Sequence, residues 1–199
     1  MRKAYISIAS LLLFGSVLMA QSPANRTAKT TAADVLAQMP AEKQAEYNKL
    51  INDLKGTGEE GVLMLVNMIN APGKGSNAQV DYALSGLTHY VMAKGEESAR
   101  LATANAYLKA LDMVNERETK AFIIRQLQIL GQDECIDALS AYLGDESLSG
   151  PAARALAANG SENAGKALQA ALMRRMGTPK TQKDIIVAIG EAQVEGTED

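Results

Sequence analysis

The chain has 199 residues, of which 47% are hydrophobic, 4% aromatic and 22% charged, and its net charge is −3. The single cysteine, Cys135, excludes an internal disulfide, and the acidic balance disfavours a surface that follows nucleic-acid phosphates. The length allows one domain with a sizeable core, so stability has to come from packing.

The N-terminal segment 1–20, MRKAYISIASLLLFGSVLMA, has the pattern of a secretory signal peptide. Arg2 and Lys3 precede an uncharged run from Ile6 to Ala20, which is too short to span a bilayer as a helix. No cysteine follows this run directly, so the pattern excludes a lipoprotein. We expect cleavage after Ala20, a periplasmic or secreted protein, and no stable membrane insertion after cleavage. Cleavage leaves 18 of the 20 basic residues against 23 acidic ones.

The rest of the chain divides into a spacer and one helical domain. Residues 21–31, QSPANRTAKTT, are small and polar without periodicity, so they predict a flexible spacer. Over residues 32–199 the apolar residues recur at helical spacing, which predicts an all-α repeat domain. The pattern predicts helices over 41–54, 59–70, 77–93, 97–114, 118–130, 133–143, 148–158, 161–175 and 179–190. They make about four helix pairs and a partial fifth.

Three glycines mark an internal repeat of about 30 residues: Gly131, Gly160 and Gly190. Each is expected to end a helix in the left-handed conformation, and Asp133 and Ser161 are placed to cap the helices that follow. Equivalent positions carry similar residues, namely Leu127, Leu156 and Ile186 four before the glycine, Cys135, Ala164 and Val194 four after it, and Leu139 and Leu168 eight after it. Single pairs cannot bury their apolar faces, so the pairs are expected to stack.

The segment 155–172, ALAANGSENAGKALQAAL, resembles the short bacterial HEAT-like repeat, a type also found in phycobilisome lyases. The resemblance is good over 118–194 and weaker over 41–114. It implies an α-solenoid of stacked antiparallel helix pairs, a HEAT-like or armadillo-like superhelix, which typically binds a protein partner. The lyase activity does not follow, because the match concerns the generic repeat alone.

Two functions are compatible with this pattern. The first is an exported, non-catalytic scaffold that mediates protein–protein interaction. The alternative is an accessory N-terminal repeat segment of a secreted carbohydrate-active enzyme. It follows from a similarity to the N-terminal part of secreted bacterial proteins that carry a 3-keto-disaccharide hydrolase domain. No hydrolase residue can be placed on this chain, and the pattern assigns no partner-binding residue.

The sequence offers few candidates for chemistry. His89, the only histidine, lies on a predicted helix without a nucleophile elbow nearby, which favours a surface or packed position. Cys135 has Ala164 and Val194 as repeat equivalents, which indicates a core position. Five acidic pairs stand at predicted helix starts, where negative charge suits the helix dipole: Glu59–Glu60, Glu96–Glu97, Glu116 with Glu118, Asp133–Glu134 and Asp145–Glu146. We therefore expect no catalytic, metal or cofactor site, and we expect that the protein is not an enzyme.

Two further stretches are open to more than one interpretation. Residues 71–76, APGKGS, lack the full spacing of a phosphate-binding loop and are expected to form a loop between repeats. A basic cluster comprises Arg174, Arg175, Lys180 and Lys183. A peptide or an anionic glycan could dock on this cluster, or its side chains could compensate the negative end of a helix dipole.

Overall fold

The structure is a computed structural model that describes residues 26–195, a range with ten α-helices, one short 3-10 helix and no strand. The helices are α1 (Ala28–Ala37), α2 (Gln44–Lys55), α3 (Gly58–Asn67), α4 (Ala78–Tyr90), α5 (Glu97–Met113), α6 (Arg117–Leu130), η2 (Asp133–Cys135), α7 (Ile136–Ser140), α8 (Ser149–Asn159), α9 (Glu162–Met173) and α10 (Pro179–Glu195). The predicted all-α class is confirmed for this part of the chain.

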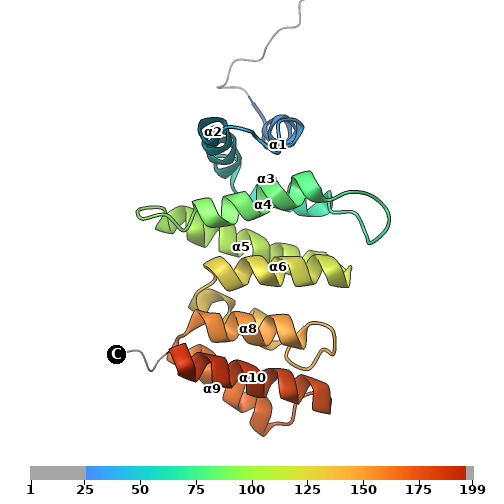
Figure 1. The fold of residues 1–199 in the computed structure, drawn as a ribbon, viewed down its shortest axis with the longest axis vertical. Helices are drawn as coiled ribbons and strands as arrows, with labels where there is room; N and C mark the ends of the chain where they lie inside the picture. Colours follow the sequence, from blue (N-terminus) through green and yellow to red (C-terminus); the bar gives the residue numbers. More distant parts are fainter. Residues whose placement is uncertain (1–25, 196–199) are drawn as a thin grey trace, which may run out of the picture.

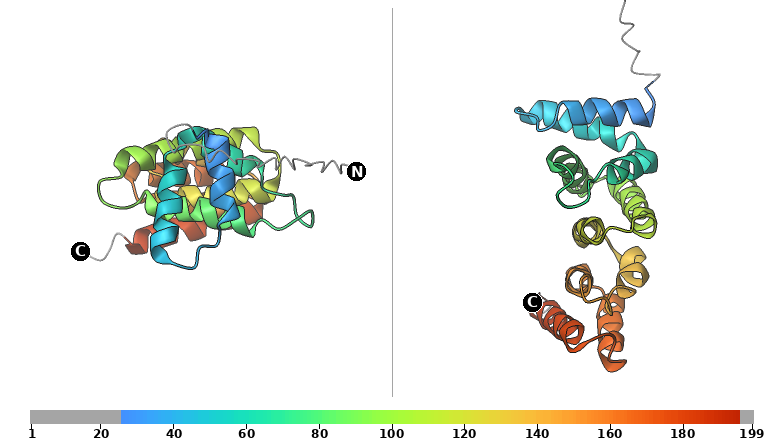
Figure 2. Two further views of the ribbon diagram at one scale, coloured as in Figure 1. Left: turned by 90° about the horizontal axis from the view of Figure 1, so that it is seen from above. Right: turned by 90° about the vertical axis from the view of Figure 1, so that its right-hand side faces the viewer.

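The helices form two layers in which alternate helices of the chain lie next to each other. In the odd layer α1 contacts α3, α3 contacts α5, α5 contacts η2, and α7 contacts α9. In the even layer α2, α4, α6, α8 and α10 make contact in that order. Figure 2 (right) shows the layers as two columns of helices seen end-on, from α3 and α4 to α9 and α10. The first and last described helices therefore lie at opposite ends of the stack (Figure 1).

The first two helices, α1 and α2, lie crosswise on the rest of the stack (Figure 1). In Figure 1, α1 and α2 are seen nearly end-on, whereas α4, α6, α8 and α10 run across the view. The α2 helix meets α4 at Gly86, where a Cβ atom would clash with the Tyr47 hydroxyl and lie 2.8 Å from Ile51 Cδ1. The rings of Tyr47 and Tyr82 meet edge to face with centroids 5.5 Å apart. Glycine at position 86 therefore allows the crosswise helix its close approach.

One apolar core runs between the layers. On α5, Ala104, Tyr107 and Leu111 follow each other at helical spacing and are buried. The Tyr107 hydroxyl donates to the backbone oxygen of Leu84 at 3.1 Å and lies 3.0 Å from Thr88 Oγ1. This buried tyrosine has its polar atom satisfied and fixes α5 against α4.

The structure contains a helix that the sequence pattern did not predict. The α1 helix begins at Ala28, so the last four residues of the predicted spacer 21–31 are helical, and the spacer prediction is wrong there. Thr27 caps this helix, because the Thr30 N–H donates to Thr27 Oγ1 at 3.2 Å. The apolar face that includes Val35 is buried against the core. The start of α1 is hard to recognise in the sequence because polar residues, including the capping Thr27, occupy it.

This helix changes the expected organisation of the repeat domain. Each of the nine predicted helices has a counterpart in the structure, but α1 precedes them. The predicted boundary at residue 32 falls inside α1. The predicted signal peptide 1–20, the spacer residues 21–25 and the terminal residues 196–199 lie outside the described residues.

The three repeat glycines do not share one conformation. Gly160 is left-handed with φ 69° and follows α8, and Ser161 caps α9 by accepting a backbone N–H at 3.2 Å, as predicted. Gly131 is extended instead, with φ −75° and ψ 139°. Gly190 lies inside α10, which runs on past the predicted end at residue 190. The prediction of a left-handed helix end is right at Gly160 and wrong at Gly131 and Gly190.

The buried positions follow a period that the glycines only approximate. Leu127, Leu156 and Ile185 are buried at intervals of 29 residues, one each in α6, α8 and α10. Ile186, which the glycine alignment places in this series, is 55% exposed. The buried position in α10 is therefore Ile185, one residue before the predicted Ile186. The glycine alignment fails here because Gly190 is not a helix end.

The helix after Gly131 is shorter than the predicted range 133–143. A 3-10 turn over Asp133–Cys135 leads into α7, which has five residues. Asp133 does not cap this helix as predicted; its Oδ2 accepts a hydrogen bond from Asn163 Nδ2 in the next pair at 2.9 Å. The short α7 leaves a groove beside α9 in the odd layer.

Candidate binding surface

A groove of 330 Å³ lies between α4, α6 and the loop that joins α3 to α4. Its apolar lining includes Ile69, Pro72 and Phe122, and its charged lining includes Asp81 and Arg125. An aromatic ring beside two opposite charges can hold an apolar side chain together with polar groups of a ligand.

The loop wall of this groove is held by two asparagines. The Asn70 N–H donates to Asn77 Oδ1 at 2.7 Å, and Asn77 Nδ2 donates to the backbone oxygen of Asn70 at 3.0 Å. Gly73 takes a left-handed φ of 75° within the loop. The stretch 71–76 is therefore a loop, as predicted, and it joins α3 to α4 and helps to form the groove.

The two charges in the groove act on each other. Partial burial raises the pKa of the Asp81 carboxyl above its usual value of 3.8, and the positive charge of Arg125 opposes this shift. The ionised Asp81 is thus partly desolvated beside a cation. A ligand that brought a positive group to Asp81 would relieve this cost.

The even-numbered helices keep exposed residues between their contacts with neighbouring helices. The residues that stay fully or partly exposed include two aromatic rings, two arginines and several apolar side chains. We call this surface the even-layer face, and it comprises Tyr82 and His89 of α4, Phe122, Arg125 and Ile129 of α6, Arg154 of α8 and Val187 of α10. Aromatic residues and arginine are the types enriched at protein–protein interfaces.

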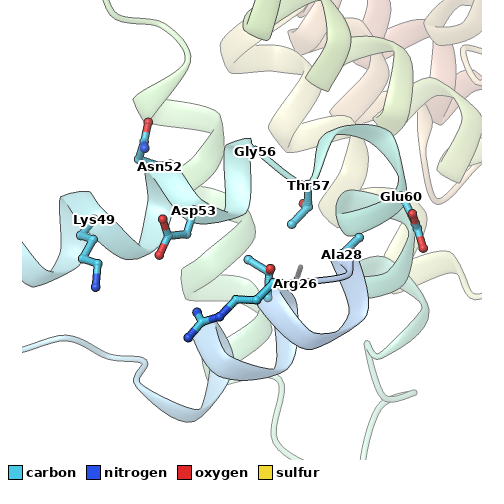
Figure 3. Close-up of a pocket in the computed structure, with 9 residues that line it drawn as sticks. Arg26, Ala28, Lys49, Asn52, Asp53, Gly56, Thr57 and Glu60 are labelled. Carbon is cyan, nitrogen blue, oxygen red and sulfur yellow. The ribbon is translucent and has the colours of Figure 1, made fainter. Parts of the chain in front are cut away.

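A larger cavity of 630 Å³ lies among α1, α2 and α3 (Figure 3). Arg26 extends from the start of α1 toward Lys49 and Asp53 of α2 (Figure 3). Arg26 also pairs with Asp34, with 3.3 Å between Nη1 and Oδ2. The lining of the cavity carries both signs of charge and includes no aromatic ring. The cavity therefore lacks an aromatic anchor like Phe122 in the groove beside α6.

The single histidine and the single cysteine lie in different parts of the structure and do not share a site. His89 is exposed in the last turn of α4 and belongs to the even-layer face. Cys135 is 1% exposed in the core, and burial raises the pKa of its thiol to about 12. Its repeat equivalent Ala164 is also buried, which confirms the core prediction, while the side chain of Val194 lies outside the described residues.

Four of the acidic pairs lie at helix starts as predicted, and several of these residues also bridge helices. Glu59 lies in the first turn of α3 and pairs with Lys109 of α5. Glu96 precedes α5 and pairs with Lys55 of α2, with 2.8 Å between Oε1 and Nζ. Asp145 precedes α8 by a turn and accepts two backbone N–H groups of the loop. The sequence predicted that these acids stabilise helix starts, and the structure shows that some of them also form ion pairs with other helices.

Sequence reasoning missed Arg100, the one arginine that is buried between residues 26 and 192. Its side chain is 4% exposed, with Nη1 2.7 Å from Glu134 Oε1 and Nη2 2.9 Å from Glu97 Oε1. Four residues before Ala104, it stands on the buried stripe of α5. A charge on an apolar stripe is the signal that could have identified it.

Residues 26–195 contain no group of three or more histidine, cysteine, aspartate or glutamate side chains able to hold a metal ion. None of the helices from α1 to α10 combines the length and hydrophobicity needed to cross a bilayer.

Comparison with known proteins finds no relative of this chain. No family model, curated protein or solved structure matches it significantly. The resemblance to HEAT-like repeats therefore stays a prediction.

Proposed function

We propose that residues 26–195 form an α-solenoid of HEAT-like helix pairs that binds a protein partner on its even-layer face, without catalysing a reaction. One observation carries the proposal: odd helices pack on odd and even helices on even along the stack. Packing of this kind leaves residues of the even helices exposed along the stack, and repeat proteins use such surfaces for binding.

The chemistry of the even-layer face supports a protein as the partner. Phe122 offers a partly buried aromatic anchor in the groove, and Arg125 and Asp81 offer both signs of charge beside it. Tyr82 and Ile129 extend the apolar area along α4 and α6, with 42% and 38% of their surfaces exposed. A protein segment with an apolar side chain between charged ones would complement this surface.

Site-specific photo-crosslinking in the native host tests the proposed surface. A photoreactive phenylalanine derivative would replace Arg125 or Arg154 on the even-layer face, and Asn105 on α5 as the control in the odd layer. We expect one common adduct from the first two positions and none from the third. The change Arg125→Glu should remove the adduct formed from position 154. Equal adducts at all three positions, or none at any of them, would contradict the proposal.

We also propose that a signal peptide, residues 1–20, directs export of the protein and is then removed by cleavage. The intact mass of the native protein, purified from the host envelope and medium, tests this step. We expect a species about 2 kDa lighter than the full 21.1 kDa chain, because a cleaved signal peptide removes some twenty residues. A native species that retains these residues would contradict export by cleavage. The alternative function, an accessory segment of a secreted sugar hydrolase, stays a prediction, and a much larger native species would support it.

A further inference from the structure

A second groove, of 340 Å³, lies in the odd layer between the end of α7 and the last turns of α9. Its lining consists of Ser140, Leu143, Arg174, Met176 and four alanines, Ala141, Ala167, Ala170 and Ala171. These small side chains fill little of the space beside the five-residue α7. The groove can therefore admit an apolar side chain from outside.

Arg174, which lines this groove, and Arg175, the next residue in the chain, have no acidic partner among the described residues. Arg174 and Arg175 are exposed, and no ion pair among the described residues involves either of them. Lys180, which the sequence grouped with them, is engaged: its Nζ donates to the backbone oxygen of Glu146 at 2.6 Å and lies 3.4 Å from Asp184 Oδ2. The predicted basic cluster thus provides one unpaired guanidinium group in the lining of the groove, that of Arg174, and a second on the adjacent exposed residue, Arg175.

The backbone at Arg175 is one that favours glycine. Arg175 has a positive φ of 50°, the only such value for a non-glycine residue in the described range. The Met176 N–H donates to the backbone oxygen of Ala171 at 3.1 Å, and the Arg175 N–H donates to that of Leu172 at 3.0 Å, which is the hydrogen-bond pattern of a glycine-type helix end. Arginine stands where glycine would make the helix end more stable.

The groove also contains an unused hydrogen-bonding group. Ser140 Oγ is buried and has no hydrogen-bond partner, and Ser140 lines the groove. Buried hydroxyls normally have a partner, so Ser140 is an exception in the wall of the groove, although its oxygen has almost no surface open to a ligand.

We infer that this groove binds an acidic peptide segment, which places an apolar side chain against Ala167 and Ala170 and a carboxylate on Arg174 and Arg175. Guanidinium groups bind carboxylates with paired, charge-assisted hydrogen bonds, so charge complementarity selects the occupant. The site lies in the odd layer and is independent of the function proposed for the even-layer face.

Fluorescence anisotropy with a short labelled peptide that contains Leu-Leu-Glu-Glu tests the inference. Matched peptides with glutamine or lysine in place of glutamate serve as controls. We expect saturable binding of the acidic peptide that weakens with added salt, because both partners are partly exposed charges. The double variant Arg174→Gln, Arg175→Gly should bind about tenfold more weakly, since it loses two charge-assisted contacts. The variant Arg125→Gln, on the even-layer face, should bind as the wild type does.

Two single variants separate lost binding from lost folding. Arg175→Gly should unfold at a higher urea concentration than the wild type and yet bind the acidic peptide more weakly. Ala141→Trp should fill the groove and weaken binding although both arginines remain.

Four results would overturn the inference. They are no saturable binding of the acidic peptide, equal binding of the glutamine peptide, unchanged binding by the double arginine variant, or a preference of the protein for anionic phospholipid vesicles over the acidic peptide.

Discussion

Arg100 Nη1 donates a hydrogen bond of 2.6 Å to the backbone oxygen of Leu130, the last residue of α6. The carbonyl groups at a helix end have no partner within the helix, and here a side chain of α5 provides one. This contact gives a physical reason for the extended conformation of Gly131. The helix end is satisfied across the layers by Arg100, so it does not need the left-handed turn that ends α8 at Gly160.

We expect Arg100→Met to destabilise the fold. The change leaves the Glu134 carboxylate and the Leu130 carbonyl without their buried donor, a loss of about 3 kcal/mol in the free energy of unfolding. Urea unfolding followed by circular dichroism measures this value. Lys109→Met is the control, because it breaks an exposed ion pair with Glu59 and should cost less than about 1 kcal/mol. Equal effects of the two changes would contradict the role assigned to Arg100.

We expect Gly86→Ala to weaken the packing of α2 on α4. The added methyl group meets the Tyr47 hydroxyl and Ile51 Cδ1, which predicts a loss of about 1–3 kcal/mol in unfolding free energy. The loss should be smaller in a Tyr47→Phe background, because the hydroxyl oxygen is gone. Gly165→Ala in α9 is the matched control: its Cβ meets nothing within 4 Å, so it should stabilise the helix by up to about 1 kcal/mol. Stabilisation by both alanines would show that α2 does not approach Gly86 closely.

The Cys135 thiol should be unreactive in the folded protein. Burial raises its pKa to about 12, and the thiolate is the reactive form, so a disulfide reagent at pH 8 should label it at least about a hundredfold more slowly than in 8 M urea. Absorbance of the released thiol product gives both rates. The variant Asn105→Cys in a Cys135→Ala background should label rapidly without urea, since position 105 is exposed on α5. Rapid labelling of native Cys135 would place it outside the core.

Asp81→Asn should change stability in a pH-dependent way. The folded-state pKa of Asp81 lies above its usual value of 3.8, so ionisation disfavours the folded state as pH rises through this range. The asparagine variant avoids this cost and should be slightly more stable than the wild type at pH 7. The difference in stability between the variant and the wild type should vanish near pH 3. This pH is about one unit below the usual pKa of the carboxyl, so the group is mostly protonated in both the folded and the unfolded state. Thermal unfolding at the two pH values gives the comparison, and a variant less stable than the wild type at pH 7 would refute the sign.

The candidate surfaces depend on contacts that no sequence spacing displays. Asp81 and Arg125 come from helices separated by the whole of α5, and they share a groove because α4 packs on α6. The sequence did indicate that Arg174 and Arg175 belong to a basic cluster. Only the structure shows that Lys180 is engaged elsewhere and that Arg174 lines a groove.

The sequence by itself determined the helical class, most helix positions and the cap of α9 at Ser161. These features depend on apolar spacing and on hydrogen bonds within a few residues, which a local pattern contains. Tertiary structure alone decided that Gly131 is extended, that Arg100 is buried, that α10 continues through Gly190, and that α1 and α2 lie crosswise. Each of these depends on an atom from a distant helix or on the space it leaves, and local propensity carries no information about either.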